Sequence, residues 1–87
     1  MKVRPEYDLD ATGRNMRRIR TERNLSVDDV RRYMKLESVQ AVYKWELGRC
    51  FPSADNLMAL AELYEVHPAE LLVRNDIVQR RNERCCC

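Results

Sequence analysis

Four neighbouring side chains of residues 38–48, SVQAVYKWELG, fall on one side of a potential helix and offer different contact chemistries. The Gln40 amide can donate and accept hydrogen bonds together, as an adenine edge requires, and the Lys44 ammonium can donate to guanine O6 and N7. Val39 can meet a thymine methyl group, and Tyr43 can reach a phosphate or a base edge. These residue types at this spacing suit a surface that reads double-stranded DNA.

The other side of the same helix is expected to be buried. Val42 and Trp45 lie three residues apart on one stripe, so we expect both to pack in a core, with Trp45 as an anchor rather than a stacking platform. An ordinary amphipathic helix with a polar outer face shows the same pattern. Periodicity alone therefore leaves DNA contact and a plain solvated face as alternatives.

Helical spacing predicts the elements that must position this helix, and no segment alternates like a strand. The predicted fold is all-α, a compact five-helix bundle. The expected helices run over residues 10 to about 23, 26–34, 38–47, from Ser53 through Tyr64, and briefly within VHPAELL, residues 66–72. The side chains expected to face the core on the other helices are Met16, Ile19, Val30, Met34, Leu57, Leu60, Ala61 and Tyr64.

End signals support these boundaries. Asp10 and Ser38 are expected N-caps, and Ser26 followed three residues later by Asp29 resembles a capping box. Gly48 suits the left-handed position after the third helix. The second and third helices, joined by the short segment KLES, form the skeleton of a helix-turn-helix, whose second helix enters the major groove.

Charge is divided unevenly along the chain, although its total is only +2. Residues 11–50 hold ten Lys or Arg and five Asp or Glu, whereas residues 51–73 hold four acids and no base. A basic half beside an acidic half suggests one face for a polyanion and another for a different partner. A solvated surface with uneven charge is the alternative.

The 87 residues suffice for one domain. We divide the chain into a flexible N-terminal arm over 1–9, a domain over 10–73 with its helix-turn-helix at about 26–47, and a polar Arg-rich tail over 74–87. No apolar run approaches the roughly 20 residues that span a bilayer. The first ten residues, MKVRPEYDLD, lack the apolar stretch of a secretory signal, so the cytoplasm is the expected location and no membrane partner is expected.

The cysteines do not form a recognisable framework. Three of the four, Cys85 to Cys87, end the chain, so they cannot cross-link distant segments, and their spacing differs from the C-x2-4-C of zinc ligands. We expect no metal and no cofactor, and the lone His67 is expected to cap the fifth helix. No Ser/His/acid or Cys/His arrangement is visible, so an enzyme is not expected.

From about Thr12 to Leu72, the chain resembles the Cro/C1-type (XRE-like) helix-turn-helix family of bacterial and phage regulators. The resemblance rests on MRRIRTERNLSVDDV, SVQAVYKWELGRCFPSADNLMALAELYEV and HPAELL, which stand in the family's order and spacing. It implies a lambda-repressor-like DNA-binding domain that inserts helix 38–47 into the major groove. It also implies sequence-specific binding, usually as a homodimer on a repeated half-site, with repression as the commonest outcome.

The resemblance also implies individual contacts by position. Base contacts are implied for Val39, Gln40 and Lys44. Phosphate contacts, which position a protein without specifying sequence, are implied for Ser26, Ser38, Tyr43 and Arg49. Arg20 and Glu46 match a pair that forms a structural salt bridge between the first and third helices.

The chain departs from the family pattern around the turn. KLES is one residue longer than the turn of the best-known members, and Lys35 stands where the family prefers Gly, so a positive φ would be strained there. Arg31 occupies a position where a small residue usually lets the two helices approach. Val27 stands where many relatives use Gln to reach DNA. These departures bear on the residue-level DNA contacts rather than on the fold.

Two further partners follow from these patterns. A homodimer is expected through the C-terminal helix region, with Leu72, Val73 and Ile77 as interface residues. The alternative to a DNA-binding regulator is a protein-docking module or antitoxin of the same fold. In that case the acidic helices of residues 53–73 would bind a protein partner.

Overall fold

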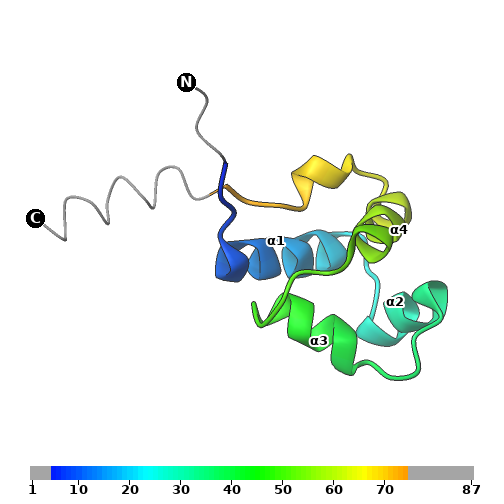
Figure 1. The fold of residues 1–87 in the computed structure, drawn as a ribbon. Coiled ribbons are helices and arrows are strands. Elements are labelled where there is room, and N and C mark those ends of the chain that lie inside the picture. Colours follow the sequence, from blue (N-terminus) through cyan, green and yellow to red (C-terminus); the bar gives the residue numbers. More distant parts are fainter. Residues whose placement is uncertain (1–4, 75–87) are drawn as a thin grey trace, which may run out of the picture.

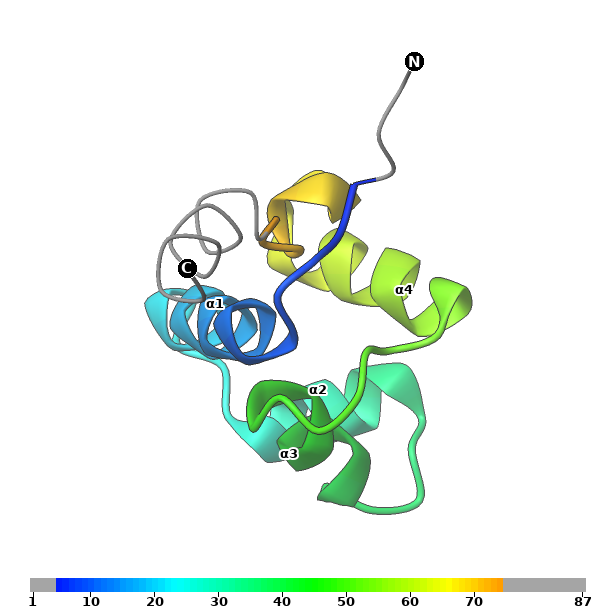
Figure 2. The same ribbon diagram turned by 60° about the vertical axis from the view of Figure 1, so that its left-hand side comes forward.

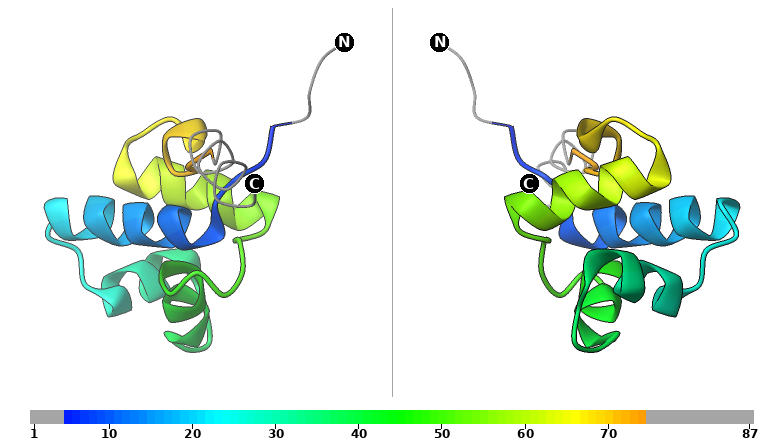
Figure 3. Two further views of the ribbon diagram at one scale, coloured as in Figure 1. Left: turned by 90° about the vertical axis from the view of Figure 1, so that its left-hand side faces the viewer. Right: turned by 90° about the vertical axis from the view of Figure 1, so that its right-hand side faces the viewer.

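Helix α1, Leu9–Glu22, packs against the helix that carries the candidate DNA contacts, in a computed structural model that describes residues 5–74. That helix is α3, Gln40–Glu46, and it follows α2, Val27–Met34. Helix α4, Ala54–Tyr64, packs against α2 and leads into a short 3-10 turn, η1 (Figure 1). In both views of Figure 3, α3 forms the lower edge of the molecule, whereas α4 lies in its upper half beside α1, so α3 protrudes on a side that α4 leaves free.

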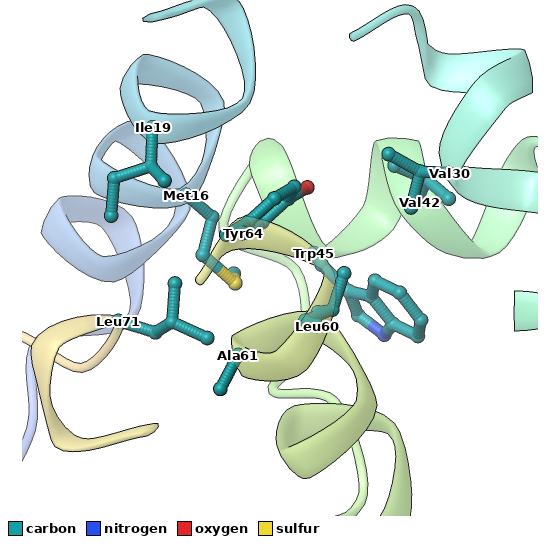
Figure 4. Close-up of a cluster of buried hydrophobic side chains, with 9 residues drawn as sticks. All are labelled: Met16, Ile19, Val30, Val42, Trp45, Leu60, Ala61, Tyr64 and Leu71. Atoms are coloured by element: carbon teal, nitrogen blue, oxygen red, sulfur yellow. The ribbon is translucent and has the colours of Figure 1, made fainter. Parts of the chain in front are cut away.

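The apolar stripes of the four helices meet in one core. Figure 4 shows the nine buried side chains converging: Met16, Ile19, Val30, Val42, Trp45, Leu60, Ala61, Tyr64 and Leu71. The predictions for Val42 and for Trp45, which is 5% exposed, are therefore confirmed. Met34 and Leu57 pack against this core while remaining partly exposed.

The N-cap of helix α1 is Asp8, two residues before the expected Asp10, so the prediction of Asp10 as the N-cap was wrong. The carboxylate of Asp8 accepts a hydrogen bond from the Ala11 amide at 2.9 Å, and its backbone is extended, as a cap requires. The reason lies far away in the sequence, because the Asp8 amide donates to the Val73 carbonyl at 2.7 Å. That bond holds Asp8 extended and leaves Asp10 in the first turn, where its charge complements the helix dipole.

The bundle has four α-helices within residues 5–74, and the expected fifth helix is a single 3-10 turn, η1, Pro68–Glu70. The chain does not continue as a helix after η1, because Val73 and Arg74 pair with the N-terminal part of the chain instead. The Val73 amide donates to the Thr12 hydroxyl at 2.9 Å, and Tyr7 and Arg74 form an isolated antiparallel bridge. Figure 2 shows the segment before α1 passing close to the segment that follows η1. His67 does cap this turn, as predicted, because its Nδ1 accepts from the Ala69 amide at 3.1 Å.

The interface expected on a fifth helix changes with it. Leu72 and Val73 are partly buried beside the N-terminal segment, and Ile77 lies outside the described residues. Leu72 instead lines a small apolar groove of about 140 Å³ with Tyr7, Phe51, Pro52 and Leu57. None of the helices between residues 5 and 74 has both the length and the apolar character needed to cross a bilayer.

Candidate nucleic-acid interface

Helix α3 separates its buried and exposed faces as its spacing predicts. Val42 and Trp45 are buried, whereas Gln40, Tyr43 and Lys44 are exposed; Tyr43 is 45% accessible. Within the described residues, the side chains of Gln40 and Lys44 make no hydrogen bond or ion pair. Their hydrogen-bonding groups are therefore free to contact another molecule.

The start of α3 differs from the prediction, and Ser38 is not its N-cap in the strict sense. Val39 occupies the cap position, partly buried, and its side chain caps nothing. The Ser38 hydroxyl still accepts a hydrogen bond from the Gln40 amide at 3.3 Å, so it satisfies one amide at the start of α3. Ser38 thus stays exposed at the N-terminal end of α3, and Arg49 is exposed just beyond its other end.

Close backbone contact fixes α3 against α1. A Cβ atom added at Gly13 would lie 2.6 Å from the Glu46 carbonyl oxygen and 2.7 Å from that of Trp45. Any larger residue would push the two helices apart. Gly48, at φ 74°, ends α3 in the left-handed conformation expected of it and lies equally close to Asp10.

A buried ion pair joins the same two helices. Arg20 Nε donates to Glu46 Oε2 at 2.7 Å, and Arg20 Nη2 donates to Oε1 at 3.2 Å, while the two side chains are only 11% and 6% exposed. Arg20 Nη1 also donates to the Leu25 carbonyl at 2.8 Å, which ties in the loop before α2. The hydrogen bond that Arg20 donates to the Glu46 carboxylate raises the pKa of Arg20 above its ordinary value, against the opposing effect of burial.

The predicted capping box at the start of α2 is confirmed. The Ser26 hydroxyl accepts from the Asp29 amide at 3.0 Å, and the Ser26 amide donates to the Asp29 carboxylate at 2.8 Å. That backbone hydrogen bond lowers the pKa of Asp29. Because the Ser26 amide is occupied, its hydroxyl hydrogen is what Ser26 can still offer to a phosphate.

The departures around the turn take a definite form. Lys35 adopts φ 58°, the left-handed conformation for which glycine is preferred. Arg31 stays half-exposed rather than entering the helix interface, because its guanidinium turns back to Asp28 at 2.7 Å. That bond, followed by one from Arg32, lowers the pKa of Asp28. Val27 remains partly exposed at the first position of α2.

Half of the basic side chains in residues 11–50 already have an acidic partner, although Glu22 and Asp28 are each shared by two arginines. Five form ion pairs with acids of the same region: Arg18, Arg20, Arg23, Arg31 and Arg32. Five have no ion pair or hydrogen bond from their side chains to any residue between 5 and 74: Arg14, Arg17, Lys35, Lys44 and Arg49. The basic charge available to a polyanion is therefore concentrated on these five residues.

Arg17 was missed by the sequence reasoning. The structure places it beside α3, where it lines a cavity together with Tyr43 and Leu47. A signal was present, because Gly13, Arg17 and Arg20 follow the i, i+4, i+7 spacing of one helical face. An isolated glycine within a helix points to a close packing contact, and here it identifies the face that meets α3.

Other predicted features lie away from this surface. The acids of α4 and the residues that follow it are all exposed: Asp55, Glu62, Glu65 and Glu70. Cys50 is an exposed free cysteine, and residues 5–74 contain no cluster of acidic, His or Cys side chains that could hold a metal ion. Cys85 to Cys87, together with the tail that carries them, lie outside the described residues.

A helix-turn-helix family profile matches residues 16–71, well over half of the chain. Among solved structures, the restriction-modification controller protein C.AhdI from Aeromonas hydrophila is 30% identical with a TM-score of 0.67, over 74% of this chain and 96% of its own. The S. venezulae BldD DNA-binding domain is 29% identical with a TM-score of 0.63, over 75% and 96%. The clp gene regulator ClgR from C. glutamicum shares the fold at 17% identity and a TM-score of 0.65, over 76% and 84%. No curated protein sequence matches the chain.

The sequence order, the α2–turn–α3 geometry and these matches agree with one another. The fold resembles those of a restriction-modification controller protein and of a DNA-binding domain, and the family profile covers all four helices except the first half of α1. The chain belongs to the Cro/C1-type (XRE-like) family of helix-turn-helix DNA-binding transcriptional regulators.

Proposed function

We propose that this protein is a sequence-specific transcriptional regulator that inserts α3 into the major groove of its operator. The supporting observation is the two-sided arrangement of α3. Its exposed side chains have no partners within residues 5–74, whereas its inner face is fixed by Val42, Trp45 and the Arg20–Glu46 pair. A helix held this firmly presents its hydrogen-bonding groups in one orientation, as base readout requires.

In this proposal three side chains of α3 and its cap read bases. Gln40 would pair with adenine through its amide, and Lys44 would donate to guanine O6 and N7. Val39, partly exposed at the start of α3, would contact a thymine methyl group. Their positions on one face allow all three to approach successive base pairs.

Four other exposed side chains would hold the DNA backbone. Ser38 and Arg49 flank the two ends of α3, and Ser26 opens α2, while Tyr43 lies between the base-reading residues. Backbone contacts of this kind set the register of the protein on the duplex but carry no sequence information.

The regulator would bind as a homodimer, because a single recognition helix reads few base pairs and two-fold dimers place half-sites about one helical turn apart. The apolar groove beside Leu72 supports this, since Tyr7 and Phe51 at its rim are each at least 40% exposed. Repression by occupation of the operator, in the cytoplasm where the operator is found, is the outcome that the family favours.

The test begins with selection of binding sites from a random duplex library. We expect an enriched inverted repeat, and Gln40→Ala and Lys44→Ala should each weaken binding to it by about 1–3 kcal/mol. Arg18→Ala is the matched control for Lys44→Ala, because it removes one charge from a residue that is already paired with Glu22. A folded protein that enriches no site at low salt would overturn the proposal.

A second candidate, docking of a protein partner, is favoured by the outer face of α4. There Met58 is 59% exposed between the exposed acids Asp55 and Glu62. This candidate predicts that Met58→Ser with Glu62→Gln abolishes partner binding, while Gln40→Ala and Lys44→Ala have no effect. Measuring both pairs of variants against duplex and partner separates the two functions.

A further inference from the structure

A cavity of about 280 Å³ opens beside α3, between that helix and α1. It is lined by Arg17, Arg20, Val27, Tyr43, Glu46 and Leu47. Tyr43 belongs both to this cavity and to the exposed face of α3, so the cavity opens next to the surface proposed to enter the groove. It is large enough to admit a tetrahedral anion with its water.

The cavity carries one uncompensated positive charge. Arg20 and Glu46 neutralise each other through two hydrogen bonds of 2.7 and 3.2 Å. Arg17 lies one helical turn before Arg20, is exposed, and has no partner among residues 5–74. Its nearest paired neighbour on α1, Arg18, is bound by both Glu22 and Asn15 and faces elsewhere.

Arg17 and Tyr43 together provide the donors that a phosphate needs. A guanidinium presents two parallel N–H groups that match two phosphate oxygens, and a phenol hydroxyl can donate to a third. Tyr43 lines the same cavity as the Arg20–Glu46 pair, so its phenol lies beside a pair whose charges already compensate each other. No acidic side chain other than Glu46 lines the cavity.

We infer that this cavity binds one phosphate group of the DNA backbone, held by Arg17 and Tyr43. The inference rests on the proposed function and adds a contact from α1, a helix to which no DNA contact has been assigned. A phosphate contact in this cavity fixes the distance between the DNA backbone and α3. It therefore determines how deeply Gln40 and Lys44 reach into the major groove.

The decisive variants are Arg17→Gln and Arg17→Lys, with Arg18→Gln as the matched control. Affinity is measured on the selected operator and on a scrambled duplex over a range of salt concentrations. Arg17→Gln should reduce the slope of log K against log salt by about 1 and weaken both duplexes about fivefold at 0.15 M salt. Arg17→Lys should keep the slope, and Arg18→Gln should change neither quantity.

Tyr43→Phe separates the hydroxyl from the ring. It should weaken both duplexes by the same factor, about fivefold, with no change in slope, because it removes a hydrogen bond but no charge. If Arg17→Gln binds like the parent, or weakens the operator alone, the phosphate site is wrong even though the proposed function stands.

A second measurement tests the site without DNA. Inorganic phosphate is titrated into the folded protein at low salt, and the Nε–H signal of Arg17 and the ring signals of Tyr43 are followed by NMR. Weak, saturable shifts at both residues are expected. If the parent protein binds no duplex but shows these shifts, the cavity is a site for free phosphate instead. If neither residue shifts, the phosphate site is wrong.

Discussion

Replacement of Glu46 by alanine should be one of the most damaging single changes in this domain. The change leaves the Arg20 guanidinium buried, with its side chain 11% exposed, and removes the acceptor of two of its three hydrogen bonds. Removing one partner of a buried pair costs about 3–5 kcal/mol. In a domain of this size each kcal/mol corresponds to about 4–8 °C in Tm, so a loss of at least about 12 °C is expected.

The assay is thermal and urea unfolding at pH 7, followed by far-UV circular dichroism. Glu62→Ala is the matched control, because Glu62 is exposed on α4 and its removal should change stability by less than about 0.5 kcal/mol. Arg20→Met combined with Glu46→Leu should regain part of the loss, since no charge is then left buried. A Glu46→Ala protein that melts within 3 °C of the parent, roughly the effect of a surface change, would refute the reasoning.

Four smaller predictions concern backbone strain and pH. Lys35→Gly should raise stability by about 1 kcal/mol, measured by urea unfolding, because φ is 58° there. Gly48→Ala should lower stability in the same assay, since φ is 74° and the new Cβ would lie 2.9 Å from the Asp10 Cα. The Ser26 amide lowers the pKa of Asp29, so the Asp29 carboxylate stabilises the fold above its unfolded pKa of 3.8. This stabilisation is lost as the pH falls through the lower pKa of the folded state. In Asp29→Asn the midpoint of urea unfolding should therefore depend less on pH across that range. Burial raises the pKa of Tyr64 above its ordinary value of 10, so stability should fall as the pH rises past 10, and this fall should disappear in Tyr64→Phe.

Local patterns predicted the faces and ends of helices that depend on near neighbours. The burial of Val42 and Trp45 follows from spacing alone, and the capping box of Ser26 and Asp29 needs only four residues. His67 likewise caps a turn that lies directly after it. Such features could be predicted because their causes lie within one or two helical turns of the chain.

Features that depend on distant contacts could not be predicted in this way. Asp8 rather than Asp10 caps α1 because Val73, far along the chain, accepts its amide hydrogen. Val73 also donates its amide hydrogen to the Thr12 hydroxyl, and this contact leaves a single turn where a fifth helix was expected. Arg17 becomes a candidate contact only when α1 is placed against α3.

The contact at Gly13 has a consequence for how this domain would adapt to its target. Backbone meets backbone there, with no flexible side chain to yield, and the Arg20–Glu46 pair joins the same two helices, so a tilt of α3 relative to α1 would disturb both contacts. On the proposed binding mode, any mismatch between the spacing of the groove and the position of α3 must be absorbed by the duplex. Base-pair steps at which the duplex bends easily or its groove narrows easily would then be preferred, even where no side chain touches the bases. Part of the operator's sequence would therefore be selected for the deformability of the DNA.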